Sequence, residues 1–311
     1  MNEASLRAGA VVVAFALDRL IGEPPPGFHP VVWMGRALGA SGAPWPCRSP
    51  RAQFLRGALV WVVGAAVVIL VAASAAAMLR RLPLAPPWAG LARILVLGIL
   101  LKPLLAWRML RDEVAGVEGA LATGLEPGRR RLSHLVSRDT GRLSEVEVRE
   151  SALESLAENL NDSLVAPLLW FTCAGLPAAA LYRFTNTADA MWGYRGRWEW
   201  AGKWAARADD LLSYVPARLT ALLLAVSGRR MPRGLRAVAG VTPSPNSGWP
   251  MGMLALALKV CLRKPGVYAL NPGGTTPSAV HTQRALVVCS RAAWLTVVLS
   301  VTGLALLGNR S

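Results

Sequence analysis

The chain has 311 residues, of which 53% are hydrophobic, a mean hydropathy of +0.38 and a formal net charge of +16. It is more apolar than a typical soluble globular protein, and its basic residues are dispersed between apolar segments, which argues against a nucleic-acid ligand. The four cysteines are isolated and only three histidines occur, so the composition does not favour a structural zinc or iron–sulfur site.

Three long apolar segments are candidates for helices that span a membrane, because a bilayer core needs about 20 such residues. They are Gly57–Leu79, Leu91–Leu110 (interrupted by Lys102 and Pro103) and Ala285–Leu307. The earlier apolar run Ala8–Leu17 continues into Asp18 without a small-residue cleavage site, and we interpret it as a retained segment. We therefore expect an all-α, polytopic integral membrane protein with one domain over residues 1–311, with amphipathic helices and polar loops that form a site at the membrane surface.

A fourth apolar segment, Leu164–Tyr182, carries two prolines. The first two spans should form a hairpin that returns the chain to its starting side, and the polar clusters should all open to that side. A full crossing by Leu164–Tyr182 would separate the cluster Asn186–Arg195 from the others. We therefore expect this segment to re-enter or to lie shallow, and we expect loops at Gly39–Pro50 and Pro265–Pro277.

An acidic helix is predicted to begin after Ser144. Ser144 and Glu147 have the spacing of a capping box, in which two side chains satisfy the first backbone N–H groups of a helix. Glu154, Glu158 and Asp162 then recur every four residues, so their like charges stack one turn apart and repel each other. This stripe is either the solvated face of an amphipathic helix or a set of carboxylates that binds a cation such as Mg²⁺, an arginine or an amine.

Arg138 and Asp139 lie immediately before this helix. The N-terminus of a helix favours anions. The two residues therefore offer a phosphate-binding and a metal-binding group beside the acidic stripe.

Two further clusters have two interpretations each. Asn186 and Asp189 are either part of an N-terminal helix cap or oxygen ligands for Mg²⁺. Asp210, Tyr214 and Arg218 are four residues apart, which places them on one helical stripe. Arg218 there forms either an internal ion pair with Asp210 or a contact with a metal–phosphate group.

For two further segments a structural role is the first interpretation and a ligand contact is the alternative. His29 follows a proline-rich turn, where a lone histidine is more often structural, although with Arg36 nearby it could contact a phosphate or a carboxylate. Pro245–Pro250, which includes Asn246, has the composition of a turn, and its amides could also line a ligand cleft.

Taken together and in order, these motifs resemble the CbiB/CobD family of cobalamin biosynthesis. The resemblance rests on the segments DRLIGEPPPGFHPVVWMGR, SRDT, ESLAENLNDSLVAPL, YRFTNTADAMWGYR, ADDLLSYVPARLTA and SPNSGWP. They extend from Asp18 to Trp249, over most of the chain. One departure is Met251, since many members carry an acidic residue directly after the Trp-Pro.

The resemblance implies an adenosylcobinamide-phosphate synthase, a multi-pass protein of the cell (inner) membrane whose active site faces the cytoplasm. Such an enzyme is an ATP-dependent ligase that joins adenosylcobyric acid to 1-aminopropan-2-ol phosphate or threonine phosphate. A carboxylate is a poor electrophile, so ATP would convert it to an acyl phosphate that the amine attacks. The implied cofactors are ATP and Mg²⁺. The implied partners are the corrinoid, the amino-alcohol phosphate, the lipid bilayer and other membrane-associated enzymes of the pathway.

The residues expected to form this site come from all the polar clusters. The expected catalytic carboxylates are Asp139, Glu154, Glu158, Asp162 and Asp189. The expected substrate- and phosphate-binding residues are His29, Arg36, Arg138, Asn186, Arg195, Asp209, Asp210, Arg218 and Asn246. Glu158 and Asp162 are the expected ligands of Mg²⁺.

Two other classes of function compete with this one. AmpE, a regulatory membrane protein, is a distant relative of the family, but a signalling protein need not keep the polar clusters intact. A transporter is disfavoured because the acidic helix resembles a surface-facing site and no paired repeats occur.

Overall fold

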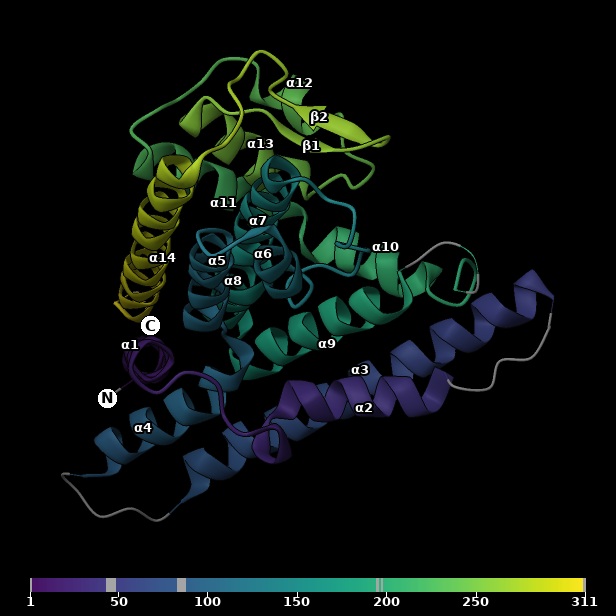
Figure 1. Ribbon diagram of the computed structural model, residues 1–311. Helices are drawn as coiled ribbons and strands as arrows, with labels where there is room; N and C mark the ends of the chain where they lie inside the picture. The colour runs from purple at the N-terminus through teal and green to yellow at the C-terminus, as the bar shows by residue number, and fades with distance from the viewer. Residues whose placement is uncertain (1, 43–48, 83–87, 194–195, 197, 310–311) are drawn as a thin grey trace. The chain divides into compact units, whose positions relative to one another are not determined.

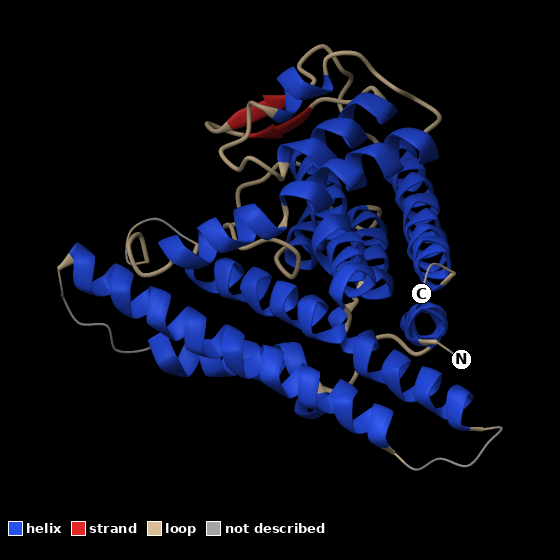
Figure 2. Cartoon of the chain, turned by 180° about the vertical axis from the view of Figure 1, so that it is seen from behind, coloured by secondary structure: helices blue, strands red, loops and turns tan. Residues whose placement is uncertain are grey.

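The computed structural model describes residues 2–42, 49–82, 88–193, 196 and 198–309, which are helical almost throughout (Figures 1 and 2). The contacts divide the chain into two compact units. Unit 1 comprises Met1–Ala106, Ala166–Leu212 and Val297–Ser311, and unit 2 comprises Trp107–Val165 and Ser213–Thr296. The expectation of one domain over residues 1–311 stays a prediction.

Unit 1 contains the N-terminal helices and the helices that follow the acidic segment. Its elements are α1 (Glu3–Leu20), η1 (Pro26–Phe28), α2 (Pro30–Gly42), α3 (Pro50–Arg81), α4 (Ala89–Leu101), η2 (Lys102–Leu104), α8 (Ala166–Ala174), α9 (Leu176–Trp192) and α10 (Lys203–Leu212).

Unit 2 contains the acidic helix, shorter helices around it and a small hairpin. Its elements are α5 (Trp107–Leu121), α6 (Leu125–Leu132), α7 (Glu145–Leu160), the π-helical turn η3 (Asn161–Val165), α11 (Tyr214–Ser227), α12 (Leu235–Ala239), α13 (Gly248–Leu258), β1 (Leu262–Lys264) and β2 (Tyr268–Leu270). The last helix, α14 (Ala279–Gly308), contributes residues to both units.

Three helical stretches of the described chain are long and apolar enough to cross a bilayer. They are α3, the stretch Ala89–Leu121 that includes α4 and α5, and α14. The three expected segments are thereby confirmed as helical stretches that could span a membrane. The interruption of the second one is confirmed too, because α4 ends at Leu101 and the 3-10 turn η2 follows it.

The core of unit 1 lies where α2, α3 and α10 pack on α9, which Figure 1 draws beside α2 and α3. Leu38 of α2, Ala65 of α3 and Ala205 of α10 surround Phe184 and Trp192 of α9, and all five side chains are buried. Burial of large aromatic side chains contributes about 1.5–3 kcal/mol each, so this cluster fixes the position of α9 on the long apolar helix.

The segment Leu164–Tyr182 is not one continuous helix. Gly175 adopts a φ of +74°, a conformation that costs little only for glycine, and it separates α8 from α9. The expectation that this segment re-enters or lies shallow stays a prediction, and a chain broken in this way is compatible with it.

Helix α7 occupies the centre of unit 2, where it packs against α5, α6, α13 and β1. Leu153, Leu156, Ala157 and Leu160 have no exposed surface, as the periodicity of the acidic helix predicts. The antiparallel hairpin of β1 and β2, red in Figure 2, was not expected, because its second strand falls in the segment Pro265–Pro277 that was predicted to be a loop.

Candidate active site

The predicted start of the acidic helix is confirmed by a complete capping box. The Ser144 hydroxyl accepts the N–H of Glu147 at 3.3 Å, and the Glu147 carboxylate accepts the N–H of Ser144 at 2.7 Å. Four residues into the helix, the guanidinium of Arg149 binds the carboxylate of Glu118 on α5 at 2.8 Å. These contacts fix both the first turn of α7 and its rotation against α5.

That rotation buries part of the acidic stripe. Ser151 and Glu154 are 1% and 5% exposed, and Glu158 is half-buried. Burying a carboxylate is costly unless other groups compensate its charge. The solvated-face interpretation is therefore wrong for Glu154, and the cation-binding interpretation remains for Glu154 and Glu158.

The buried stripe forms one wall of a cleft of about 170 Å³ within unit 2. The other walls come from the segment before α7 and from the β1–β2 hairpin. The residues that line the cleft are Leu135, Val136, Ser137, Arg138, Ser151, Glu154, Ser155, Glu158, Asn159, Lys264 and Tyr268. The structure thus brings together three of the predicted site residues: Arg138, Glu154 and Glu158.

Two cations face the two carboxylates of the cleft. Arg138 donates a hydrogen bond to the Ser151 hydroxyl, and its Nη2 lies 3.5 Å from Oε2 of Glu154. Lys264, at the end of β1, is exposed at the rim. The cleft therefore offers charges of both signs within a small volume.

Burial perturbs the acidity of Glu154. It raises the pKa of this carboxyl group from 4.5 to about 7, although Arg138 and the hydroxyl of Tyr268 act in the opposite direction. Oε1 of Glu154 is buried and has no hydrogen-bond partner of ordinary length among the described residues. Burial and the neighbouring charges of Glu154 and Glu158 raise the pKa of Tyr268 in turn. At neutral pH, Glu154 is therefore poised to gain or lose a proton.

Lys264 and Tyr268 were not predicted as site residues from the sequence. They reach the cleft because β1 and β2 pair with Lys264 opposite Tyr268. The available signal was the Pro265-Gly266 dipeptide between two short runs, since Pro-Gly marks a turn. Nothing in the chain order places a hairpin more than 100 residues away beside Glu154.

The carboxylates of the cleft fit a magnesium ion that is shared with a ligand. In the described part of the chain, no three side chains of His, Cys, Asp or Glu come together as a metal cage. Mg²⁺, however, commonly binds one or two carboxylates and completes its shell with water and substrate phosphate oxygens. Glu154 and Glu158, which line the same cleft, could supply such carboxylates.

Asp162 and Asp139 do not line this cleft. Asp162 lies in η3 and accepts a hydrogen bond from Nδ2 of Asn161 at 2.8 Å, while Oδ1 of Asn161 accepts one from the hydroxyl of Thr220 of α11 at 2.9 Å. Asp139 is exposed and accepts the N–H of Gly141 at 2.9 Å, as an aspartate in a tight turn does. Their catalytic and metal-binding roles stay predictions.

Arg218 joins α11 to the turn before α13. Its Nη1 donates to the Tyr214 carbonyl at 2.8 Å and to Oδ1 of Asn246 at 2.6 Å, and its Nη2 donates to the Pro245 carbonyl at 3.0 Å. The guanidinium also lies over the rings of Tyr214 and Trp249, at 3.6 and 4.8 Å from their centroids. These contacts explain the predicted turn at Asn246 and give Arg218 a structural role.

The predicted stripe of Asp210, Tyr214 and Arg218 on one helix is wrong. Helix α10 ends at Leu212 and α11 begins at Tyr214, so Asp210 and Arg218 lie on different helices. Pro216 explains the interruption, because a proline lacks the N–H that would bond the carbonyl four residues earlier. That carbonyl, of Leu212, accepts the indole N–H of Trp170 at 3.1 Å.

Replacing Arg218 by lysine should lower the melting temperature of the protein by several degrees in detergent and leave substrate KM values within about twofold. Lysine keeps the charge but cannot reach three acceptors with one planar group, and hydrogen bonds to charged groups contribute about 1.5–3 kcal/mol each. Arg230→Lys, an exposed position after α11, is the matched control. A several-fold rise in KM at an unchanged melting temperature would instead assign Arg218 to phosphate binding.

His29 belongs to a charged cluster within unit 1. Its Nε2 lies 2.9 Å from Oε2 of Glu23, and its Nδ1 accepts the N–H of Val31 at 3.2 Å. Nζ of Lys102 lies 2.9 Å from Oε1 of Glu23 and 3.5 Å from Oδ1 of Asp18, which is fully buried. Burial alone would raise the pKa of Glu23, but the hydrogen bonds from His29 and Lys102 outweigh it and lower the pKa. Both ring nitrogens of His29 are thus engaged, which favours its structural interpretation.

A second polar cluster of unit 1 lies where α9 and α10 meet. Nδ2 of Asn186 donates to Oδ1 of Asp209 at 3.4 Å. Asp210, on the next position of α10, forms an ion pair with Arg207 at 3.7 Å. Asp189 lies in the last turn of α9, so the interpretation of Asn186 and Asp189 as an N-terminal cap is wrong, since α9 begins at Leu176.

The two remaining phosphate-binding candidates are arginines. Arg36 is exposed on α2. Arg195 lies outside the described residues. The roles predicted for both stay predictions.

A family model described as CobD/Cbib protein matches residues 11–296. Several curated proteins are similar over nearly the whole chain. A probable cobalamin biosynthesis protein CobD of Thermococcus kodakarensis is 40% identical over 288 residues, which cover 92% of this chain and 90% of that protein. The cobalamin biosynthesis protein CobD of Rhodobacter capsulatus is 38% identical over 314 residues, which cover 94% of this chain and 96% of that protein.

A third relative, from Dehalococcoides mccartyi, carries the same description and is 35% identical over 268 residues, covering 84% of this chain and 85% of that protein. No solved structure matches the chain significantly.

Proposed function

The chain belongs to the CobD/CbiB family of cobalamin biosynthesis proteins, and from this premise we propose that it is the ATP-dependent ligase that makes adenosylcobinamide phosphate. It joins a propionate carboxylate of adenosylcobyric acid to the amine of 1-aminopropan-2-ol phosphate or of threonine phosphate. The product is an amide, and ATP supplies the free energy.

The observation that carries this proposal is the pairing of charges in the cleft of unit 2. An amino-alcohol phosphate carries an ammonium group and a phosphate a few bonds apart. Glu154 and Glu158 offer negative charge for the ammonium, and Arg138 and Lys264 offer positive charge for the phosphate. The volume of about 170 Å³ is below the roughly 300–1,000 Å³ of a pocket for a drug-sized ligand, so it suits this small substrate and not the corrinoid.

The acidity of Glu154 suits the proton transfer that the amide bond requires. The ammonium group must lose a proton before its nitrogen can attack, and a base with a pKa of about 7 accepts that proton efficiently near neutral pH. Glu158 lines the same cleft and holds the ammonium group. Arg138 positions the phosphate, and its other hydrogen bond, to Ser151, fixes its side chain.

ATP activates the carboxylate of the corrinoid as an electrophile. The terminal phosphoryl group of ATP moves to the propionate oxygen, which gives an acyl phosphate and ADP. The amine nitrogen, having given its first proton to Glu154, attacks the acyl carbon. Inorganic phosphate leaves with the carbon–oxygen bond electrons and takes the second proton from nitrogen. Mg²⁺, held by Glu158 together with phosphate oxygens, would neutralise the charge that develops on the transferring group.

The protein acts in the cell (inner) membrane. The three apolar helical stretches support a membrane location. An ATP-dependent reaction would require an active site on the cytoplasmic face. Other membrane-associated enzymes of cobalamin biosynthesis are its proposed partners. An AmpE-like signalling role is the alternative, and a buried carboxylate with a raised pKa disfavours it, because signalling does not require such a group.

Purified protein in detergent, supplied with ATP, Mg²⁺, adenosylcobyric acid and aminopropanol phosphate, should form the amide and release ADP in equal amounts. Mass spectrometry of the corrinoid measures the product. Omitting ATP should abolish the product. If the protein binds the corrinoid but no amide forms with either amino-alcohol phosphate, the ligase function is wrong and a signalling or transport role takes its place.

A further inference from the structure

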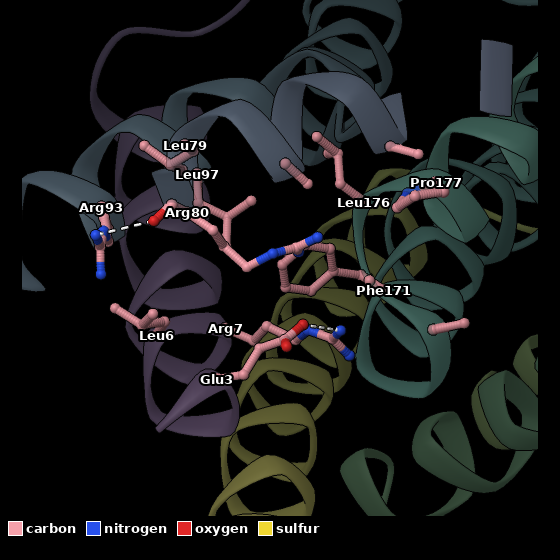
Figure 3. A pocket seen from close by; sticks show the side chains of 14 residues that line it. Glu3, Leu6, Arg7, Leu79, Arg80, Arg93, Leu97, Phe171, Leu176 and Pro177 are labelled. Carbon is pink, nitrogen blue, oxygen red and sulfur yellow. Dashed lines mark hydrogen bonds and ion pairs between the residues drawn. The ribbon is translucent and has the colours of Figure 1, made fainter. Parts of the chain in front are cut away.

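A second pocket, of about 460 Å³, lies in unit 1 and is separate from the candidate active site. It is formed by the first turns of α1, the last turns of α3, the beginning of α4 and the junction of α8 and α9 (Figure 3). Apolar side chains such as Leu79, Leu97, Phe171 and Leu176 make up most of its lining. None of the motifs that resemble the CbiB/CobD family lies in it.

Three arginines and one glutamate interrupt this apolar lining, which gives it a net charge of +2. Arg7 is paired with Glu3, and its guanidinium packs against the backbone of Gly175. Arg93 donates to the carbonyls of Arg80 and Leu82, at 3.0 and 3.3 Å. The positive charge therefore lies at the junction of several helices.

Some hydrogen-bond donors of the arginines in this pocket have no acceptor among the described residues. The side chain of Arg80 forms no hydrogen bond or ion pair with any residue that the structure describes, and it extends across the pocket towards Phe171 in Figure 3. Nε of Arg93 is buried without a hydrogen-bond partner in the described part of the chain. A buried N–H group of a cation without an acceptor is costly, so an anionic ligand would remove this cost.

The position of the pocket along α3 suits the headgroup region of a bilayer. Helix α3 has 32 residues, which extend about 48 Å at about 1.5 Å per residue, whereas the apolar core of a bilayer is about 30 Å thick. Arg80 is the last residue but one of this helix. In a helix that crosses the bilayer, this position would put its guanidinium at the depth of the lipid phosphates, next to side chains that suit an acyl chain.

We propose that this pocket binds one anionic phospholipid, whose phosphate contacts Arg80, Arg93 and Arg7 and whose acyl chain lies along α3. A basic pocket between membrane helices is a known type of site for anionic headgroups. The apolar lining favours a lipid over a free phosphate ion, which would gain nothing from Phe171 and Leu176. The positive net charge favours an anionic lipid over a zwitterionic one.

Native mass spectrometry of the full chain in a non-ionic detergent, titrated with phosphatidylglycerol, tests this site. We expect one tightly bound lipid, with an affinity about tenfold higher than for phosphatidylcholine. Arg80→Gln should weaken binding about fivefold and Arg7→Gln combined with Arg80→Gln about 25-fold, because each arginine near an anionic lipid contributes about 1 kcal/mol. Arg80→Lys, which keeps the charge, should retain most of the affinity.

Arg81→Gln is the matched control, because it removes the same charge from the same helix end but does not line the pocket. Its affinity for phosphatidylglycerol should equal that of the unchanged protein. Equal loss in Arg80→Gln and Arg81→Gln would show that the lipid responds only to net charge and would overturn the site. Complete displacement of the lipid by millimolar inorganic phosphate would show that the pocket binds a soluble anion and would overturn the lipid site. Equal binding of phosphatidylglycerol and phosphatidylcholine would overturn the role of the arginines.

Discussion

Glu154→Gln should lower kcat of the proposed ligase by at least about 100-fold at pH 7, with little change in KM for ATP. The variant keeps the shape of the side chain but cannot accept a proton, and general base catalysis contributes about 10²–10⁴-fold. Steady-state measurement of ADP release, with the amide product measured in parallel, gives both constants. Glu145→Gln, an exposed carboxylate in the first turn of the same helix, is the control and should keep kcat within about twofold.

The same substitution should stabilise the protein at alkaline pH. The pKa of Glu154 is about 7 in the folded chain and near 4.5 when unfolded, so between these values the unfolded state releases the proton first. The wild type therefore loses stability as pH rises from about 5 to about 7 and does not regain it above that, whereas Glu154→Gln lacks this loss. A melting temperature of the variant that is lower than that of the wild type at pH 8, together with near-normal kcat, would contradict both the buried titration and the role as a base.

Arg138→Gln should raise KM for the amino-alcohol phosphate by about 10- to 100-fold, because a hydrogen bond to a charged group contributes about 1.5–3 kcal/mol. KM for the corrinoid should change little. Arg138 also lowers the pKa of Glu154, so its removal should move the rise of kcat with pH to higher pH. This shift is a second effect that a simple loss of folding would not produce.

Arg142→Gln is the control for this change, because Arg142 is exposed, follows Arg138 by four residues and does not line the cleft. Arg138→Lys should recover part of the affinity, since a lysine can bind one phosphate oxygen but not two at once. Unchanged KM in Arg138→Gln with a normal pH profile would show that the phosphate binds elsewhere, and the clusters of unit 1 would then be the next candidates.

The membrane helices and the start of α7 were predictable because both depend on local sequence. A run of about 20 apolar residues can satisfy its backbone only as a helix in lipid, and the capping box of Ser144 and Glu147 needs no distant partner. The break near Lys102 was predictable for the same reason, because Pro103 removes a backbone donor.

The other helix boundaries depended on contacts that periodicity does not show. The spacing of Asp210 and Arg218 fits one helix, but Pro216 frees the carbonyl of Leu212, which the distant Trp170 then accepts. The extent of α9 similarly depends on the packing of Phe184 and Trp192 against α3. Asn186 and Asp189 were interpreted as a possible cap because the sequence does not show that α9 already begins at Leu176, ten residues before Asn186.

The candidate site was predictable where one helix supplies it. The spacing of Glu154 and Glu158, with Arg138 just before the helix, gave its acidic wall and one cation. Burial could not be read from that spacing, because it depends on which helices cover α7, and it is burial that changes the chemistry of Glu154. Lys264 and Tyr268 come from a hairpin too short to show a strand pattern.

The cluster of Asp18, Glu23, Lys102 and His29 has a consequence for the order in which the chain enters the membrane during synthesis. Asp18 and Lys102 are both buried, and each alone in lipid would cost about 2.5–3.5 kcal/mol. The first helix therefore gains its partner charge only after some 80 further residues have emerged from the ribosome. Until then the N-terminal helix should stay at the membrane surface, and a nascent chain that ends before Pro50, and so lacks α3, should be released from the membrane by alkaline extraction.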